Sequence, residues 1–470
     1  MKGFSEKEIG NLVEDWSKRI VRLKMEIMAM KEVYETPNLV ESSMYDAIPE
    51  KEVRDFLCRI VHDKTKSSLS GAIGSLVGLV VSDAVGHWFE FMDVVDVPRD
   101  HGAGSFDSTS FKFTAPIRNK FLLKPGQWTD DSSMALCMAD SLISKLRFDG
   151  SDIRIRFWSW WFRGYCNAFR RDEKRKNKAS VGLGGNISKS LLRMDPHTTP
   201  QSRVPNSGRN DSGNGSLMRL APISIFFADD LNVLLDRAAL SSLTTHPGME
   251  AVEACKFLAF LTSRAIQTDS SSTSMKAFLD DSVRVYLRDV LPPSKEEKRD
   301  GKTEMRRLLI AKESSDSLER NWNWRESRLY IRDTLHARIK ASPDGTYNGD
   351  HPVSLSYFGA YCMDGMAVAL HSLYNTHSFG RAVERCVNFM GDADTTSAIC
   401  GQVAGAFYGL ESIDPRFLEL LLHWDNGDCV IRAVLLHELG KHAMKKKKKE
   451  QGKEEEEEKT DVSEVDVGVV

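Results

Sequence analysis

The sequence predicts an all-α protein: a compact multi-helix bundle with a helical N-terminal extension and a charged C-terminal tail. Long segments carry apolar residues at helical spacing, whereas alternating runs of β type are scarce. The loops between these segments are rich in Gly, Ser, Asn and Pro. Two segments also carry small residues at every fourth position, which indicates close backbone contact between packed helices. These positions are Gly74, Gly78, Ser82 and Gly86 in the first segment, and Gly401, Gly405 and Gly409 in the second.

Four regions follow one another along the chain. Helical periodicity near the start marks residues 1–66 as an N-terminal extension. The main domain is expected to span 67–443, with a polar insertion from 268 to about 345 that contains weak helical stretches. Residues 444–470 are a low-complexity tail with runs of lysine and glutamate. These runs cannot bury apolar area, so we do not expect the tail to pack against the core.

The composition bears on the class of partner. The chain has 470 residues, of which 41% are hydrophobic and 28% charged, as is usual for a globular protein. Its net charge of −3 gives no overall basic field, so we expect neither nucleic acid nor a membrane as partner. The apolar run GAIGSLVGLVV, residues 71–81, stops before Asp83 and is too short to span a bilayer.

The cysteines and the N-terminus bear on location. Eight cysteines are scattered with no CxxC pair, which favours buried thiols in a reducing compartment. The start of the chain, MKGFSEKEIGNLVEDW, has no apolar signal region. We therefore expect an intracellular protein, with the cytoplasm favoured. The run of five lysines in the tail gives the nucleus as a weaker alternative.

A first acidic cluster lies in QWTDDSSMALCMADSL, residues 127–142. Thr129, Asp130 and Asp131 stand together directly before an apolar helical run. Adjacent carboxylates repel each other, and a helix needs only one side-chain oxygen as its cap. The cluster therefore indicates that a cation binds there.

A second acidic cluster lies far downstream, in NFMGDADTTSAICGQVAGAFYG. Asp392, Asp394 and Thr395 again precede a helix, the one that carries the second set of small residues. Oxygen ligands of this kind suit Mg²⁺, Mn²⁺ or Ca²⁺ rather than zinc. A helix dipole accounts for one carboxylate but not for four. We expect the two clusters to meet in a dinuclear metal site; the alternative is two independent helix caps.

A further acid lies near the first set of small residues, in VSDAVGHWFEF. Glu90 follows Asp83 by seven positions and shares its face if the helix continues. Glu90 is therefore a candidate for a catalytic carboxylate or for one that supports the metal ligands. The alternative is a surface glutamate.

Two glycine-rich segments are candidates for anion binding. SVGLGGNISKSL and NDSGNGSLMRLAPI each lead from a glycine-rich loop into a helical run, where backbone N–H groups can cradle a phosphate. Neither is a Walker A loop or a Rossmann fingerprint, and each alone is more often an ordinary loop. His246, in LSSLTTHPGMEAVEA, is a further polar candidate, although a lone histidine more often has a structural role.

These segments, in this order, resemble the ADP-ribosylglycohydrolase family. The matching stretches are LKPGQWTDDSSMAL, GNGSLMRLAPI, TTHPGMEAVEA and GDADTTSAICGQVAGAFYG, preceded by GSLVGLVVSDAVG. They cover residues 71 to about 425, apart from the insertion. The TDD[ST] and GDxDT motifs are specific in combination. The resemblance implies an all-α fold with a dinuclear magnesium centre.

The resemblance also implies roles for individual residues. The two acidic clusters match the two metal triplets of the family, and Glu90 lies where some members carry a glutamate for gating or acid–base chemistry. Three departures leave the triplets intact and bear on the acceptor: Ser82 for a usual glycine, Ser212 for an aromatic of some members, and an insertion near 268–345 that is longer than in the family. The implied catalytic residues are Glu90, Asp130, Asp131 and Asp392; the metal ligands are Thr129, Asp130, Asp131, Asp392, Asp394 and Thr395; the substrate-binding residues are Gly184, Gly185, Ser212, Asn214, Gly215 and His246.

The implied reaction is hydrolysis at the anomeric carbon of an ADP-ribosyl group on a protein side chain or a small conjugate. The implied cofactor is a pair of Mg²⁺ ions, with Mn²⁺ as an alternative. The transition state is expected to resemble an oxocarbenium ion. The expected partner is the ADP-ribosylated substrate, and a monomer is favoured. The acceptor group stays open.

Two other hypotheses compete with this one. A homologue that binds ADP-ribose or is structural, without turnover, would share the fold, but both metal triplets are complete here. A metal phosphohydrolase using His62 and Asp63 is the other. That pair lies outside the region that carries the motifs and has no neighbouring histidines at metal-binding spacing.

Overall fold

The computed structural model describes most of the predicted main domain. Two of the predicted regions, the extension 1–66 with its His62–Asp63 pair and the tail 444–470, lie outside the described residues. The limits set for all four regions therefore stay predictions. The described residues are 68–96, 104–115, 117–195, 198–204, 211–293, 300–312, 316–342, 345–347, 351–441 and 443.

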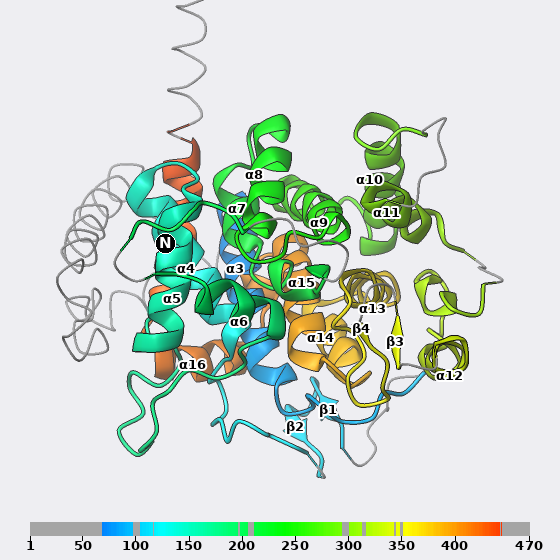
Figure 1. The fold of residues 1–470 in the computed structure, drawn as a ribbon, viewed down its shortest axis with the longest axis horizontal. Coiled ribbons are helices and arrows are strands. Elements are labelled where there is room, and N and C mark those ends of the chain that lie inside the picture. The colour runs from blue at the N-terminus through cyan, green and yellow to red at the C-terminus, as the bar shows by residue number, and fades with distance from the viewer. Residues whose placement is uncertain are drawn as a thin grey trace, which may run out of the picture.

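Helices make up nearly all of the regular structure in these residues (Figure 1). The strands form only two short antiparallel pairs, β1 with β2 and β3 with β4. The predicted all-α class is confirmed. The elements are α3 (Ser68–Gly86), β1 (Phe106–Asp107), β2 (Lys112–Phe113), α4 (Asp130–Lys145), α5 (Gly150–Arg163), α6 (Gly185–Leu192), η2 (Asn214–Ser216), α7 (Ala221–Phe226), α8 (Leu231–Leu243), α9 (Met249–Gln267), α10 (Met275–Asp289), α11 (Gly301–Ile310), η3 (Arg320–Trp322), α12 (Ile331–Ala341), β3 (Thr346–Tyr347), β4 (His351–Pro352), α13 (Cys362–Tyr374), α14 (Phe379–Val387), α15 (Ala393–Tyr408), η4 (Leu410–Ser412) and α16 (Pro415–Asp425); residues 428–441 are helical as well.

The centre of the fold is the pair of helices α3 and α15, whose small residues face each other. A Cβ atom at Gly74 would lie 2.2 Å from the carbonyl oxygen of Gly405, and one at Gly78 would lie 2.4 Å from that of Gly401. Atoms do not approach so closely, so any side chain at these positions would push the helices apart. The close contact predicted from the spacing of small residues is confirmed.

Helix α3 is buried almost along its whole length. Every residue from Ser70 to Gly86 is buried, including Asp83. By length and composition this helix is capable of crossing a membrane, but 94% of its apolar span is enclosed by the rest of the fold. It is longer than the apolar run 71–81 because the helix continues past Asp83. Its apolar character therefore reflects its position in the core.

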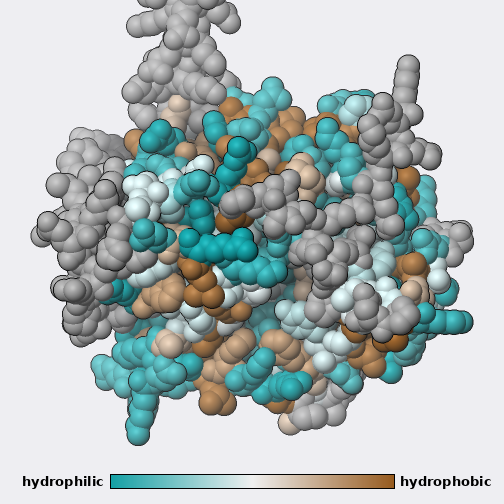
Figure 2. All heavy atoms as spheres, in the orientation of Figure 1, coloured by the Kyte–Doolittle hydropathy of each residue, from teal (hydrophilic) through white to brown (hydrophobic). Residues whose placement is uncertain are grey.

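Other helices surround the central pair and close one continuous hydrophobic core. Helices α9, α13 and α14 pack against α15, and α9 also packs against α3. On the face seen in Figure 2, hydrophilic and hydrophobic residues intermingle. Large exposed apolar side chains, such as Leu122 and Leu192, are a minority of the apolar residues.

The predicted polar insertion contains amphipathic helices that dock on the bundle. Helices α10, α11 and α12 lie together at one side of the molecule (right in Figure 1), and α10 and α11 contact α9 and α13. Trp322 and Trp324 are fully buried there. Arg338 forms an ion pair of 2.5 Å with Asp364 of α13. The helical stretches of this segment are thus more firmly packed than their polar composition suggested.

Candidate active site

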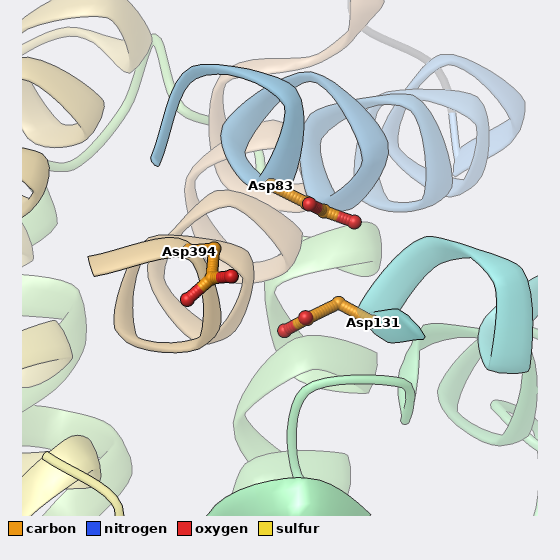
Figure 3. A group of neighbouring side chains, drawn as sticks. All are labelled: Asp83, Asp131 and Asp394. Atoms are coloured by element: carbon orange, nitrogen blue, oxygen red, sulfur yellow. The ribbon is translucent and has the colours of Figure 1, made fainter. Parts of the chain in front are cut away.

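Three helix ends bring carboxylates together next to the contact between α3 and α15. Asp83 lies near the end of α3, Asp131 at the start of α4 and Asp394 at the start of α15 (Figure 3). Each offers one oxygen, and these oxygens all lie within 4.8 Å of one another. Glu90, Asp392 and Asp394 form a second group of the same kind. Asp394 belongs to both groups and so links five acids, and the charge of Asp130 interacts with those of Asp394, Asp83 and Asp392. We call these six residues the acid cluster: Asp83, Glu90, Asp130, Asp131, Asp392 and Asp394.

Asp83 caps helix α4 from a different helix. Its carboxylate accepts hydrogen bonds from the backbone N–H groups of Thr129, at 3.0 Å, and Ser132, at 3.0 Å. It also accepts from the hydroxyls of Thr129, at 2.8 Å, and Ser132, at 2.6 Å. Thr129 itself, the N-cap residue, makes no side-chain capping bond. The capping function is therefore met by Asp83, which leaves the carboxylates of Asp130 and Asp131 available for another purpose.

The start of α15 has a similar arrangement. Asp392 is its N-cap residue but makes no side-chain capping bond. Instead its Oδ2 accepts a hydrogen bond of 2.6 Å from Nδ2 of Asn214, which also donates to the carbonyl of Gly359 at 2.9 Å. The backbone N–H of Thr395 donates to Oδ1 of Asp394 at 2.9 Å. In the described structure neither acidic triplet caps its own helix through its N-cap side chain.

Glu90 reaches the acid cluster through a turn and not through a helix. Helix α3 ends at Gly86, where a Cβ would lie 2.5 Å from Cα of Asp394, so the condition under which Glu90 would share the helical face of Asp83 is not met. The following turn leaves Glu90 only 7% exposed, so it is not a surface residue. Phe91, in the left-handed region with φ of 65°, donates its N–H to the carbonyl of Gly391 at 2.9 Å. This bond ties the Glu90 turn to the loop that precedes α15.

Burial and mutual repulsion raise the pKa values of the acid cluster. For Glu90 and for Asp130, burial is the largest cause, and the negative charge of Asp394 is the next. Both pKa values therefore lie well above those of ordinary carboxyl groups. Burial also raises the pKa values of the other members, Asp83, Asp131, Asp392 and Asp394.

Two oxygens of the cluster are buried without a hydrogen-bond partner: Oδ1 of Asp131 and Oε2 of Glu90. The ion pairs within the described residues include no member of the cluster. Buried carboxylates of this kind need a cation or protons for compensation. Their hard oxygen atoms suit Mg²⁺, Mn²⁺ or Ca²⁺. The acid cluster is therefore chemically fit to hold metal ions.

The members of the cluster differ in how free they are to bind a metal. Asp83 lies within ligand distance of its neighbours, but it already accepts bonds from four donors on α4 and the residue before it. Asp131 has one oxygen with no partner. We therefore regard Asp131 as a direct ligand candidate and Asp83 as a residue that positions the start of α4.

One predicted substrate loop lies against His246. A Cβ at Gly215 would lie 2.9 Å from Cε1 of His246, so the backbone of Gly215 approaches the His246 ring as closely as glycine allows. Ser212 is fully buried, and its carbonyl accepts a bond of 3.1 Å from the N–H of Cys362. Asn214 joins this loop to Asp392. The structure thus joins Asn214 to the acid cluster and places Gly215 of the same loop against His246.

The other predicted loop contacts the cluster through a residue that the sequence did not single out. Gly182 has φ of +89°, and a Cβ there would lie 2.0 Å from Oδ1 of Asp130. Gly184 is the N-cap of α6, and a Cβ at Gly185 would meet nothing within 4 Å. Gly185 therefore borders open space, a Cβ at Gly184 would only be in ordinary contact with Ile187 at 3.8 Å, and Gly182 is the glycine that packs against Asp130.

Comparison with known proteins gives a consistent result. A family model described as ADP-ribosylglycohydrolase matches residues 64–449. The ADP-ribosylarginine hydrolase Tri1 of Serratia proteamaculans (strain 568) is 28% identical over 355 residues, which are 76% of each chain. The ADP-ribosylhydrolase ARH3 of Homo sapiens is 23% identical over 380 residues, 78% of this chain and 93% of its own. A solved structure described as an ADP-ribosylglycohydrolase-related protein complex aligns with a TM-score of 0.52 and 25% identity, over 80% of this chain and 99% of its own.

Proposed function

The chain belongs to the ADP-ribosylglycohydrolase family, and we propose that it is a metal-dependent hydrolase that releases ADP-ribose from a protein side chain or a small conjugate. The resemblance read from the motifs and the predicted enzyme class are confirmed by the family match and by the hydrolases to which the chain is similar. The observation that carries the proposal is the meeting of both acidic triplets in one buried cluster.

The acid cluster provides the residues that would hold the metal. The carboxylates of Asp130, Asp131, Asp392 and Asp394 carry four negative charges, which would balance two divalent cations. Bound Mg²⁺ ions would supply Lewis-acid chemistry, by polarising a water molecule and the ribose oxygens. Thr129 and Thr395 would contribute hydroxyl oxygens from the same two helix starts. Asp83 and Asn214 would hold these ligands in place through their hydrogen bonds.

Glu90 is the residue that we assign to proton exchange. It is buried beside Asp392 and Asp394, and one of its oxygens has no hydrogen-bond partner. Burial and the neighbouring acids raise the pKa of Glu90 above that of an ordinary carboxyl group, which favours a role in proton exchange. Glu90 would exchange a proton with the attacking water or the leaving group as the glycosidic bond opens.

The substrate side of the proposal rests on the two loops at the acid cluster. Backbone N–H groups at the start of α6, and those around Asn214 and Gly215, would bind the diphosphate of ADP-ribose. The relatives named above act on ADP-ribosylated arginine or carry the broader description of ADP-ribosylhydrolase. We propose an ADP-ribosylated protein or a small ADP-ribose conjugate as the substrate of this chain.

The test is the release of free ADP-ribose from a panel of substrates with different linkages, with and without Mg²⁺. The panel includes proteins modified on arginine and on serine and a small ADP-ribose conjugate. We expect Mg²⁺-dependent release from at least one substrate, and its loss in Asp131→Ala and Asp392→Ala. Asp289→Ala, an exposed aspartate on α10, is the control and should keep the wild-type rate. Metal-independent release, or full activity in both cluster variants, would contradict the proposal.

A further inference from the structure

A buried hydrogen-bond chain leads from Arg219 through Thr245 to His246. Arg219 lies between η2 and α7, and the other two residues lie between α8 and α9. Their exposed fractions are 0%, 2% and 3%. Nη2 of Arg219 donates to Oγ1 of Thr245 at 2.6 Å, and Oγ1 lies 2.7 Å from Nδ1 of His246. The roles of the donors and acceptors in this chain can be derived from its first member.

Arg219 is a buried cation that forms no ion pair with a carboxylate of the described residues. Its described contacts are Thr245, Thr244 at 3.2 Å, the sulfur of Met134 at 3.6 Å and the ring of Phe157, 4.6 Å from the guanidinium carbon. Burial lowers its pKa to about 10, which still leaves the group charged at neutral pH. A guanidinium has donors only. Oγ1 of Thr245 must therefore act as acceptor toward Arg219.

Because Thr245 accepts from Arg219, its own hydroxyl proton sets the role of His246. Its hydroxyl proton needs an acceptor, and Nδ1 of His246 is the only other partner of Oγ1 among the described residues. The hydroxyl therefore donates to Nδ1, which must be unprotonated, and the neutral ring carries its proton on Nε2. With a proton on Nδ1, two donors would face Thr245, and its own buried proton would have no acceptor. A donor left without a partner costs about 1–3 kcal/mol.

The protonated edge of His246 faces Gly213 and Gly215, two loop residues without side chains. A Cβ at Gly215 would lie 3.1 Å from Nε2, and one at Gly213 would lie 3.4 Å from it. The absence of these Cβ atoms lets the ring edge approach the loop backbone directly. This is the loop to which the proposed function assigns the diphosphate of ADP-ribose.

We propose that Thr245 is a positioning residue: its hydroxyl, held by the charged Arg219, fixes the orientation of the His246 ring and keeps its proton on Nε2. The Nε2–H group can then donate a hydrogen bond to the anionic diphosphate. The proposal rests on the proposed function for its ligand. It assigns to Thr245 a role that its neighbour Thr244 does not share. Thr244 also contacts Arg219, but its hydroxyl donates to the carbonyl of Ser241 at 2.7 Å.

The first test is a direct measurement of the tautomer. In wild-type protein with ¹⁵N-labelled histidine, the signals of His246 are identified by their loss in His246→Gln. We expect Nδ1 to resonate as an unprotonated nitrogen and Nε2 as a protonated one. A proton on Nδ1 would overturn the inference, whatever the variants below show.

The second test is ADP-ribose binding, measured by calorimetry in matched threonine variants. Thr245→Val removes the hydroxyl at constant shape and should weaken binding about tenfold, the factor supplied by one hydrogen bond to a charged group. Thr245→Ser should restore affinity to within about twofold, since it restores the donor. Thr244→Val should stay close to wild type. An equal loss in Thr244→Val, or no loss in Thr245→Val, would overturn the inference.

The two proposals fail in different ways. If the wild-type protein does not bind ADP-ribose, the proposed function fails, and the ligand assigned to His246 fails with it. If the wild-type protein binds ADP-ribose but carries the proton of His246 on Nδ1, only the present inference fails. If Thr245→Val does not fold, Thr245→Ser still tests the inference. Thr245→Ser retains the hydroxyl, so a fall in its affinity for ADP-ribose would also contradict the inference.

Discussion

The carboxylate of Asp83 accepts hydrogen bonds from both the backbone N–H and the hydroxyl of Thr129. A residue of the central helix α3 thereby fixes the start of α4, where two further carboxylates follow directly. The same carboxylate binds both polar groups of Ser132. This explains how a helix can begin with two acids and yet use neither as its cap.

Asp83→Asn should weaken Mg²⁺ binding about 10- to 100-fold, the usual cost of losing a residue that orients metal ligands. The amide retains one acceptor oxygen, and its NH₂ group would oppose the donors on the other side. Isothermal calorimetry with Mg²⁺ measures the effect, and circular dichroism checks the fold. Ser132→Ala, which removes only one of the four donors, serves as the control and should cost far less. Unchanged Mg²⁺ affinity in Asp83→Asn would argue against the positioning role.

Gly405→Ala should destabilise the fold by about 1–3 kcal/mol or more, as expected for overpacking in a close helix contact. Its Cβ would lie 1.9 Å from the carbonyl oxygen of Gly74, and backbone on both sides prevents relaxation. Gly380→Ala is the matched control on α14, because its nearest neighbour would be at 3.4 Å. The control should be neutral or gain up to about 1 kcal/mol from helix propensity. Urea unfolding of both variants measures the two free energies of unfolding. Similar stabilities would contradict the close contact between α3 and α15.

The sequence predicted those parts of the fold and site whose physical role can be inferred from residues close together in the chain. Small residues at every fourth position have one physical use in a buried helix, which the contact between Gly74 and Gly405 fulfils. Paired carboxylates before a helix exceed what capping requires, so a meeting of the two triplets followed from their chemistry.

The parts that the sequence did not predict depend on tertiary contacts. Glu90 reaches the cluster because α3 ends at Gly86, where the approach of α15 leaves no room for a side chain. Gly182 packs against the carboxylate of Asp130, and no local sequence pattern predicts this contact between residues far apart in the chain. Asp83 did leave a signal, since it is a carboxylate inside an otherwise apolar helix, but its partners on α4 lie far along the chain.

In the metal-free protein the acid cluster should lower the stability of the fold as the pH rises above about 4, against the opposite contribution of the buried His87 and His371, whose pKa values burial lowers to about 3. The folded acid cluster has pKa values above the ordinary 3.8 of Asp and 4.5 of Glu, so above these values the folded state binds more protons than the unfolded state. Stability is then lost as the pH rises through the raised pKa values. Thermal unfolding between pH 4 and 8 in a chelator measures this slope.

Mg²⁺ should protect increasingly over the same pH range, because metal and protons compete for the same oxygens. Asp131→Asn removes one of the titrating groups and serves as the control, with a shallower slope and less protection. The same pH dependence of the melting temperature in Asp131→Asn and in the wild-type protein, both in chelator, would contradict the assignment.

A chain that ends at Ala443 should keep the wild-type rate and fold. The lysine and glutamate runs beyond it carry no apolar area whose burial would compensate the entropy of ordering them. The preceding helix, residues 428–441, is different: a Cβ at Gly440 would lie 2.3 Å from the carbonyl of Phe226, and Leu436 is fully buried. A chain that ends at Asn426 should therefore unfold at a much lower temperature. A large loss of rate on removal of 444–470 alone would refute the prediction.

Glu90→Gln should lower turnover by about two to four orders of magnitude, the usual contribution of a positioned acid–base group. The substitution keeps the size and hydrogen-bonding atoms of the side chain but removes its charge and its exchangeable carboxyl proton. Because Asp394 and Asp392 repel the Glu90 carboxylate, the metal-free variant should be at least as stable as the wild type. Loss of activity without loss of stability would thus mark a functional rather than a structural role.

Two measurements on this variant separate the alternatives. The affinity for ADP-ribose should change much less than the rate, since the loops around Gly184 and Gly215 are assigned to the diphosphate. Glu419→Gln, an exposed glutamate on α16, is the control and should leave both quantities unchanged. A rate for Glu90→Gln within a few-fold of wild type would remove Glu90 from the catalytic residues. A parallel fall of rate and ADP-ribose affinity would instead assign Glu90 to substrate binding, because a group that acts only in proton exchange contributes to the transition state and little to the bound ground state.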